Sequence, residues 1–254
     1  MSVSLGADVE VIIGEGDTPK SIVGIIGGSK HNPLPVRFGN LQEDNVMAEF
    51  AIDPVFTLED WIHSLNHVYH ALLERINPHN PLPIPSCNFP DSELQTPQAQ
   101  EFGCDPDLDV YTLDVVQMSP DQFQNLRTCG GHVHVGGISD IGNDNTVKLI
   151  RLLDIYLGVP SVLLDKDNNR RRFYGQAGRF RVKPYGIEYR TLSNFWIQND
   201  VLKEWVYNNT MKAVHEIDNH SLDDLEKTDV RHIIHDSNII EAQKIVQRYG
   251  VSMP

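Results

Sequence analysis

The segment TCGGHVHVGG, residues 128–137, places two histidines one residue apart among four glycines. In an extended strand, side chains two positions apart point to the same face. We therefore expect His132 and His134 to lie side by side. Paired imidazoles can bind a metal ion, contact a phosphate or form a buried structural pair, and the histidines alone leave these alternatives open.

Four carboxylates on predicted strands favour one of these roles for the histidines, the binding of a metal ion. Asp8 and Glu10 lie two residues apart in ADVEVIIG, Glu49 interrupts NVMAEFAI, and Glu188 interrupts YGIEYR. A carboxylate within an apolar strand is costly unless it is paired or bound to a metal. Salt bridges explain many single cases, but several such residues together with HVH favour a metal-organising site. Oxygen ligands with one imidazole favour Mg²⁺ or Mn²⁺ over a structural zinc.

Seven of the chain's 21 lysines and arginines fall between residues 170 and 190. They are Arg170, Arg171, Arg172, Arg179, Arg181, Lys183 and Arg190. Guanidinium groups suit phosphate oxygens, which they bind bidentately. A solvated basic loop or a partner-binding patch is the alternative. Because the run leads directly into Glu188 and Arg190 on a strand, we expect metal-binding carboxylates beside phosphate-binding arginines, as phosphoryl transfer from ATP requires.

Two further motifs carry little weight. GGSK, residues 27–30, is not a P-loop because the GxxxxGK[ST] pattern is absent, so Lys30 is equally compatible with the site and with an ordinary turn. The three cysteines, Cys87, Cys104 and Cys129, lack paired spacing, which argues against a disulfide framework or a Cys-type zinc site. We expect Cys129 to be a small buried cysteine rather than a nucleophile.

The clearest predicted helix spans residues 57–76, TLEDWIHSLNHVYHALLERI, with Thr57 as N-cap and Asp60 in the capping-box position. Its apolar residues recur at helical spacing. They are Trp61, Leu65, Val68, Leu72 and Leu73. The histidines at positions 63, 67 and 70 are expected on its surface or in a groove rather than as ligands.

The remaining elements predict one α+β domain over residues 1–254. Residues 77–100 form a proline-rich connection, residues 143–165 a helix interrupted near Gly158–Pro160, and the chain beyond about residue 200 is mostly helical. The formal net charge of −14 argues against a general nucleic-acid binder. There is neither a signal-peptide pattern in MSVSLGADVE nor an apolar run of membrane-spanning length, so a cytoplasmic protein is expected.

Several of these segments resemble one family of enzymes. GGHVHVGG is similar to the G-x-HVH strand of glutamine synthetase and the glutamate–cysteine ligases, and the arginine-rich stretch ending in GIEYR resembles their ATP segment ending in IExR. The whole set resembles most closely the phage-encoded, phiEco32-like carboxylate–amine ligases. The other matching segments are GADVEV, GGSKHNPLPV, EDNVMAEF, FGCDPDLD, DNNRRRFYG and AGRFRVKP.

The resemblance implies a role for each matching residue. Metal ligands would be Asp8, Glu10, Glu49, His132 and Glu188, although many relatives carry Glu at the position of Asp8. Nucleotide phosphates would be held by His134, Arg172, Arg179 and Lys183, with Lys30 as a further candidate. Arg179 and Arg190 would stabilise the transferring phosphoryl group. No counterpart of the glutamine synthetase ammonia loop is present, and Asp44 or Asp53 are candidate general bases by location alone.

The resemblance also implies a fold, cofactors and partners. The fold would be glutamine synthetase-like, with a curved, mainly antiparallel sheet forming a cleft and helices on its outer face. ATP and Mg²⁺ (or Mn²⁺) would be used to join a small-molecule or peptide carboxylate to an amine. The protein would act in the host cytoplasm if phage-encoded, as a monomer or a homo-oligomer.

Two other functions stay open on the sequence. A metal-dependent hydrolase or oxygenase could use His132, His134 and a carboxylate as a facial site, but this leaves the arginine run unexplained. A non-catalytic nucleotide- or peptide-binding relative would keep the fold without turnover, and the retained acids and HVH count against it.

Overall fold

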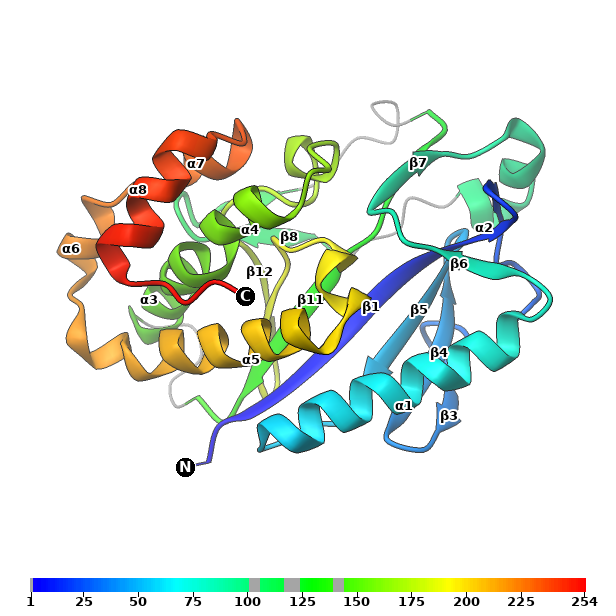
Figure 1. The fold of residues 1–254 in the computed structure, drawn as a ribbon, viewed down its shortest axis with the longest axis horizontal. Coiled ribbons are helices and arrows are strands. Elements are labelled where there is room, and N and C mark those ends of the chain that lie inside the picture. Colours follow the sequence, from blue (N-terminus) through cyan, green and yellow to red (C-terminus); the bar gives the residue numbers. More distant parts are fainter. Residues whose placement is uncertain (1, 101–105, 117–123, 139–143) are drawn as a thin grey trace.

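A mainly antiparallel open sheet forms the centre of the computed structural model, which describes residues 2–100, 106–116, 124–138 and 144–254 (Figure 1). Its strand order is β3-β4-β5-β1-β11-β13-β12-β8-β9; β2 and β6 also pair with β1, and β7 and β10 form a separate pair. The strands are β1 (Ser4–Glu15), β2 (Thr18–Lys20), β3 (Leu34–Val36), β4 (Gly39–Asp44), β5 (Met47–Ile52), β6 (Asn80–Leu82), β7 (Ser86–Asn88), β8 (Asp107–Asp109), β9 (Val115–Val116), β10 (Leu126–Thr128), β11 (Gly131–Gly136), β12 (Arg179–Lys183) and β13 (Gly186–Tyr189).

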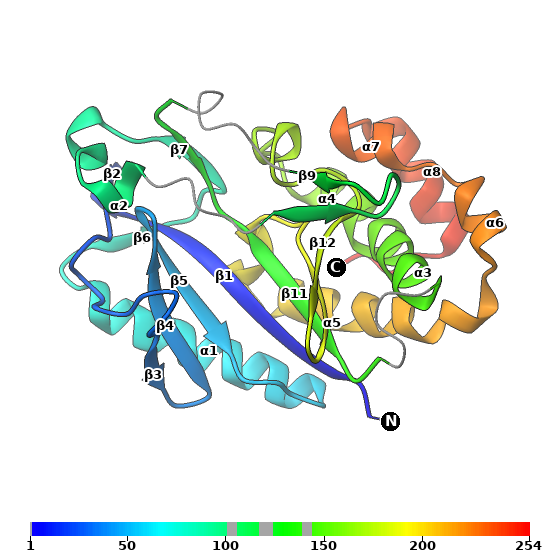
Figure 2. The ribbon, with the colours of Figure 1, turned by 180° about the vertical axis from the view of Figure 1, so that it is seen from behind.

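Helices cover one face of this sheet. The α-helices are α1 (Leu58–Ile76), α2 (Pro97–Gln100), α3 (Asp144–Leu153), α4 (Val159–Leu164), α5 (Asp200–His215), α6 (Leu222–Glu226), α7 (Arg231–His235) and α8 (Ile239–Tyr249). α1 packs on β1, β4 and β5, α3 packs on β13, and α5 packs on both helices. Figure 2 looks onto the opposite face of the sheet, with α1 and α5 behind it.

Alternation along the strands separates an apolar face from a charged one. On β1, Leu5, Ala7 and Val9 are buried toward the helices, whereas Asp8 and Glu10 point the other way. The apolar faces build one core that runs from Leu5 to Val251. Such a core suits a single domain, although the domain assignment itself stays a prediction.

The structure confirms the helix predicted over residues 57–76. The Thr57 hydroxyl accepts a hydrogen bond from the Asp60 amide at 3.1 Å, as an N-cap does. Trp61, Leu65, Val68 and Leu72 are buried, Leu73 is partly buried, and the three histidines at 63, 67 and 70 are exposed.

The helix interruption predicted near Gly158–Pro160 is a change of hydrogen-bond spacing rather than a break. A π-helical turn, η3 (Asp154–Gly158), joins α3 to α4 with helical backbone angles at both junctions. Pro160 lies in the first turn of α4, a position at which helices tolerate proline.

The predicted α+β architecture, with a mainly antiparallel sheet and helices, is confirmed. Curvature of that sheet into a glutamine synthetase-like cleft stays a prediction. Residues 77–100 contain only short elements: β6, β7, α2 and the 3₁₀ turn η1 (Asp91–Leu94). No helix within the described residues is both long and apolar enough to cross a membrane.

Candidate active site

Strand register places the predicted site residues in rows across the charged face. Asp8 of β1 lies opposite His132 of β11, and His134 lies opposite Glu188 of β13. On the other side of β1, Glu10 lies opposite Glu49 of β5. Because all these strands are antiparallel neighbours, residues far apart in sequence come together on one face.

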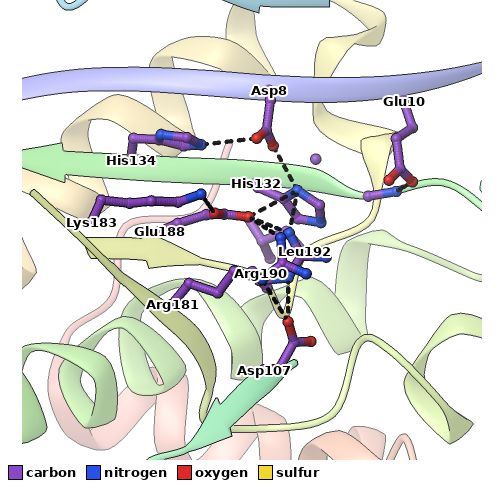
Figure 3. Close-up of polar contacts among 12 residues, drawn as sticks. Asp8, Glu10, Asp107, His132, His134, Arg181, Lys183, Glu188, Arg190 and Leu192 are labelled. Carbon is purple, nitrogen blue, oxygen red and sulfur yellow. Dashed lines mark hydrogen bonds and ion pairs between the residues drawn. The ribbon is translucent and has the colours of Figure 1, made fainter. Parts of the chain in front are cut away.

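Asp8, His132 and Glu188 form what we call the histidine group. One ligand atom from each can be chosen so that all lie within 4.8 Å of one another. His132 Nδ1 is 2.6 Å from Asp8 Oδ1 and 3.6 Å from Glu188 Oε1 (Figure 3). This spacing suits a single divalent cation held by two carboxylates and one imidazole.

Cationic side chains surround Glu188, which is fully buried. Lys183 Nζ is 2.7 Å from Oε2, Arg181 Nη1 is 3.5 Å from Oε1, and the Arg190 guanidinium also contacts Oε1. Asp107 of β8 holds the two arginines in turn, with Oδ1 at 2.9 Å from Arg190 Nε and 3.1 Å from Arg181 Nε (Figure 3). The arginines therefore lie fixed on the sheet beside the histidine group.

These charges set the ionisation of the histidine group. Burial and Asp8 act to raise the pKa of Glu188, but Arg190 and the histidines lower it to about 2. Burial likewise opposes ionisation of Asp8, yet His132 and His134 hold its pKa well below the usual range. Burial and Arg190 lower the pKa of His132 to about 4. Ionised carboxylates and a neutral imidazole are the forms that bind metal.

His134 has both ring nitrogens engaged. Nε2 lies 3.1 Å from Asp8 Oδ2, Nδ1 lies 2.5 Å from the Tyr185 hydroxyl, and the Tyr185 ring stacks on the imidazole at an angle of 14°. Among the described residues, the metal-capable group on these strands includes His132 but not His134. This group contains one histidine, whereas the hydrolase or oxygenase alternative expects two.

Glu10, Asp44 and Glu49 form a second cluster, the acidic group, whose oxygens also lie within 4.8 Å of one another. Burial together with Asp44 raises the pKa of Glu10 to about 7. Burial and the neighbouring acids raise the pKa of Glu49 well above its ordinary value. Burial raises the pKa of Asp44, and the charge of the exposed Lys30 acts to lower it. Three mutually repelling carboxylates are the donor set that a divalent cation would neutralise.

The arginine run divides into different roles. Arg170 is buried and reaches His132 Nε2 at 3.1 Å, while also donating to the Leu192 and Arg190 carbonyls. Arg171 is buried too, but it donates to carbonyls at the end of α4 and pairs with Asp165, so it serves the fold. Arg172 is exposed. Arg179 pairs with Asp109 Oδ2 at 3.6 Å.

Other residues of interest lie where the sequence did not place them. Asp44, expected only as a candidate base, joins the acidic group, whereas Asp53 is exposed beyond the end of β5. Asp107 and Tyr185 were not predicted, although the alternation in DPDLD was a signal for the first. Cys129 is buried against Met47 as expected, and Cys104 lies outside the described residues.

Comparison with known proteins identifies a matching family and a solved structure with a similar fold. Residues 118–247, about half of the chain, match the model of a family described as phage phiEco32-like COOH.NH2 ligase-type 2. No curated protein matches. Among solved structures, a bifunctional glutathione synthetase from Pasteurella multocida matches with a TM-score of 0.57 and 11% identity over 99% of this chain. The chain spans only 45% of that protein, and at this identity the likeness shows the fold alone. On the family match, this chain is a member of the phage phiEco32-like COOH.NH2 ligase family.

Proposed function

We propose that the protein is an ATP-dependent carboxylate–amine ligase with a glutamine synthetase-like catalytic face. The observation that carries the proposal is the juxtaposition of two metal-capable groups with fixed arginines on one side of one sheet. Phosphoryl transfer depends mainly on positioned cations that offset charge on the phosphates, and this face supplies both ligands for cations and guanidinium groups.

The donor sets fit two Mg²⁺ or Mn²⁺ ions. The acidic group offers three carboxylates whose pKa values are raised by burial and then by neighbouring carboxylates, so a divalent cation would relieve an existing repulsion. The histidine group offers Asp8, His132 and Glu188. When bound, such ions would neutralise phosphate oxygens and align them for in-line transfer.

The cationic side chains have separate parts in this proposal. Arg190 and Arg179 would hold the transferring phosphoryl group, and Lys183 beside Glu188 would contact the neighbouring phosphate. His134, whose Nε2 faces Asp8 and whose Nδ1 contacts the Tyr185 hydroxyl, would line the same space. Arg170 contacts Nε2 of His132, the ring nitrogen on the far side from Asp8. Lys30 and Arg172, both exposed, would at most contact the nucleotide from the rim.

The reaction would form one amide bond at the expense of one phosphoanhydride. A carboxylate oxygen of the acid attacks the γ-phosphorus and ADP leaves, which gives an acyl phosphate. The amine nitrogen then attacks the acyl carbon, phosphate leaves, and the amine loses a proton to a base. The acid and amine would be small molecules or peptides, because the strongly acidic chain does not suit general nucleic-acid binding.

The test uses hydroxylamine in place of the unknown amine. Purified protein is incubated with ATP, Mg²⁺ and a panel of carboxylic acids, and acyl phosphate is trapped as a hydroxamate while ADP is measured. In parallel, ATP carrying ¹⁸O at the β–γ bridge should exchange this label into the β-nonbridging positions only when the correct acid is present. A protein that binds Mg–ATP weakly or not at all would exclude the proposed function.

A further inference from the structure

The π-helical turn between α3 and α4 carries a carboxylate that is fully buried on the helix side of the sheet. Asp154, the first residue of this turn, has no exposed surface. Single π turns inserted in α-helices occur often at functional sites, and an unpaired buried charge is costly. A buried carboxylate at this position therefore indicates a functional role, and its hydrogen-bond partners show what that role could be.

Asp154 accepts hydrogen bonds from β13 and from the segments that adjoin β8 and β12. Oδ1 accepts from the Tyr189 hydroxyl at 2.7 Å, and Oδ2 accepts from the Tyr111 hydroxyl at 2.8 Å. The Gly178 amide also donates to this carboxylate, and the Thr191 hydroxyl lies 3.5 Å from Oδ1. Burial raises the pKa of Asp154 to about 6, although the hydrogen bonds from Tyr189, Gly178 and Tyr111 act to lower it.

The donors flank the two arginines that face the opposite side of the sheet. Gly178 immediately precedes Arg179, while Tyr189 and Thr191 lie on either side of Arg190. The Arg190 amide donates to the Arg179 carbonyl at 2.9 Å, so the two backbones are directly joined. One carboxylate thus contacts the neighbours of both arginines, through the Gly178 amide and the hydroxyls of Tyr189 and Thr191. On the other face, Asp107 pairs with Arg190 and Asp109 pairs with Arg179.

Two glycines allow this close approach. A Cβ at Gly158 would lie 2.7 Å from the Tyr189 hydroxyl and 3.3 Å from Asp154 Oδ1. Gly178 has φ of 75°, and a Cβ there would meet the Tyr111 ring at 2.7 Å. Both glycines therefore serve the same contact between the π turn and the strands.

We infer that Asp154 is a positioning residue that fixes Arg179 and Arg190 for phosphate binding. This inference rests on the proposed function, because it assumes that the two arginines contact the nucleotide. An Asn at position 154 keeps the shape but turns an amide N–H₂ toward hydroxyl or amide donors. The donors next to Arg179 and Arg190 then have one acceptor oxygen in place of two, so the two arginines are held less firmly.

The experiment compares Asp154→Asn with Asp165→Asn. Asp165 is also buried, accepts from the Ser193 hydroxyl at 2.7 Å and pairs with Arg171, so both variants lose a buried carboxylate charge. The probes are AMP-PNP with Mg²⁺ and, separately, Mn²⁺ alone, each measured by calorimetry. Because small displacements of a binding group have large effects, we expect Asp154→Asn to weaken AMP-PNP binding by about tenfold or more. The control variant Asp165→Asn should bind AMP-PNP as tightly as the wild type. The two variants should bind Mn²⁺ with the same affinity.

A second variant covers the case in which Asp154→Asn does not fold. Tyr111→Phe removes one donor to Oδ2 but keeps the ring over Gly178, and should weaken AMP-PNP binding about threefold, the scale of one hydrogen bond. If wild type binds AMP-PNP while Asp154→Asn and Tyr111→Phe match Asp165→Asn, the inference is wrong and the proposed function stands. Wild-type protein that binds no AMP-PNP would overturn both.

Discussion

Asp8 and Glu10 lie two residues apart on β1 and face the same side of the sheet, yet their pKa values shift in opposite directions. Asp8 belongs to the histidine group, where two imidazoles hold its pKa low. Glu10 belongs to the acidic group, where burial and Asp44 raise its pKa to about 7. Two carboxylates of one strand therefore differ in chemistry because their neighbours differ.

The source of the difference is the strand that lies on each side of β1. Toward β11 and β13, each carboxylate has an imidazole, guanidinium or ammonium group within 4 Å. Toward β5 and β4, Glu10 has Glu49 and Asp44 as neighbours, with Lys30 at the rim. The histidine group is balanced by the protein's own cations, whereas the acidic group has an excess of negative charge that a bound cation would offset.

The largest expected effect comes from removing the charge of Glu188. Glu188→Gln leaves Arg190 and Lys183 without their buried partner, so we expect turnover to fall by about 10³-fold and the unfolding free energy to fall by about 3 kcal/mol. ADP release and urea denaturation measure the two effects. Glu93→Gln, which weakens a pair with Lys20 away from this face, is the control. Unchanged turnover in Glu188→Gln would reject the site.

Removing one carboxylate charge from the acidic group should stabilise the protein, in contrast to Glu188→Gln. Glu49→Gln removes one of three repelling carboxylates, so the metal-free protein should gain about 1 kcal/mol of unfolding free energy. Its Mn²⁺ affinity should fall by at least about tenfold, because a ligand is lost. Denaturation in EDTA and electron paramagnetic resonance of Mn²⁺ test both. If Glu49→Gln destabilises the metal-free protein, repulsion between the three carboxylates is not the dominant effect.

The two groups should also differ in their pH dependence. The pKa of Glu10 is raised from 4.5 to about 7, so the folded state binds more protons than the unfolded state between these values. Stability of the metal-free protein should therefore fall as pH rises through this window. Glu188, with a pKa near 2, contributes stability that is lost only as pH falls from 4.5 toward 2. Melting temperatures at pH 5 and 7 check the first effect, and saturating Mn²⁺ should reverse it at pH 7.

The alternation of strand residues carried most of the information available in the sequence. Strand alternation correctly predicted that Asp8 and Glu10 share one side of their strand and that His132 and His134 share one side of theirs. That these two strands also turn the same face toward Glu188 follows from the strand register. Asp44 was harder to assign because it ends a short polar strand, GNLQED, whose side chains show no apolar alternation. Its place beside Glu10 follows from the pairing of β4 with β5, which a single sequence does not reveal.

The arginine run shows a different limit. Three consecutive arginines in a 3₁₀ turn (η4, Arg170–Arg172) point in different directions, so adjacent residues of the same type have different neighbours. Arg170 reaches His132, Arg171 satisfies carbonyls at the end of α4, and Arg172 faces solvent. Composition identified a basic segment, but only the path of the turn decides which arginine faces the site.

The smallest expected effect tests that division within the run. Arg172 is exposed, so Arg172→Ala should change the AMP-PNP dissociation constant by no more than about twofold, because exposed charges are screened by solvent and salt. Arg170→Lys, two residues away, keeps the charge but loses the guanidinium group that contacts His132 and two carbonyls. This variant should weaken binding more than Arg172→Ala does, measured in the same calorimeter at the same ionic strength. If Arg172→Ala weakens binding more than Arg170→Lys does, Arg172 contacts the phosphates, as the sequence alone predicted for the arginine run.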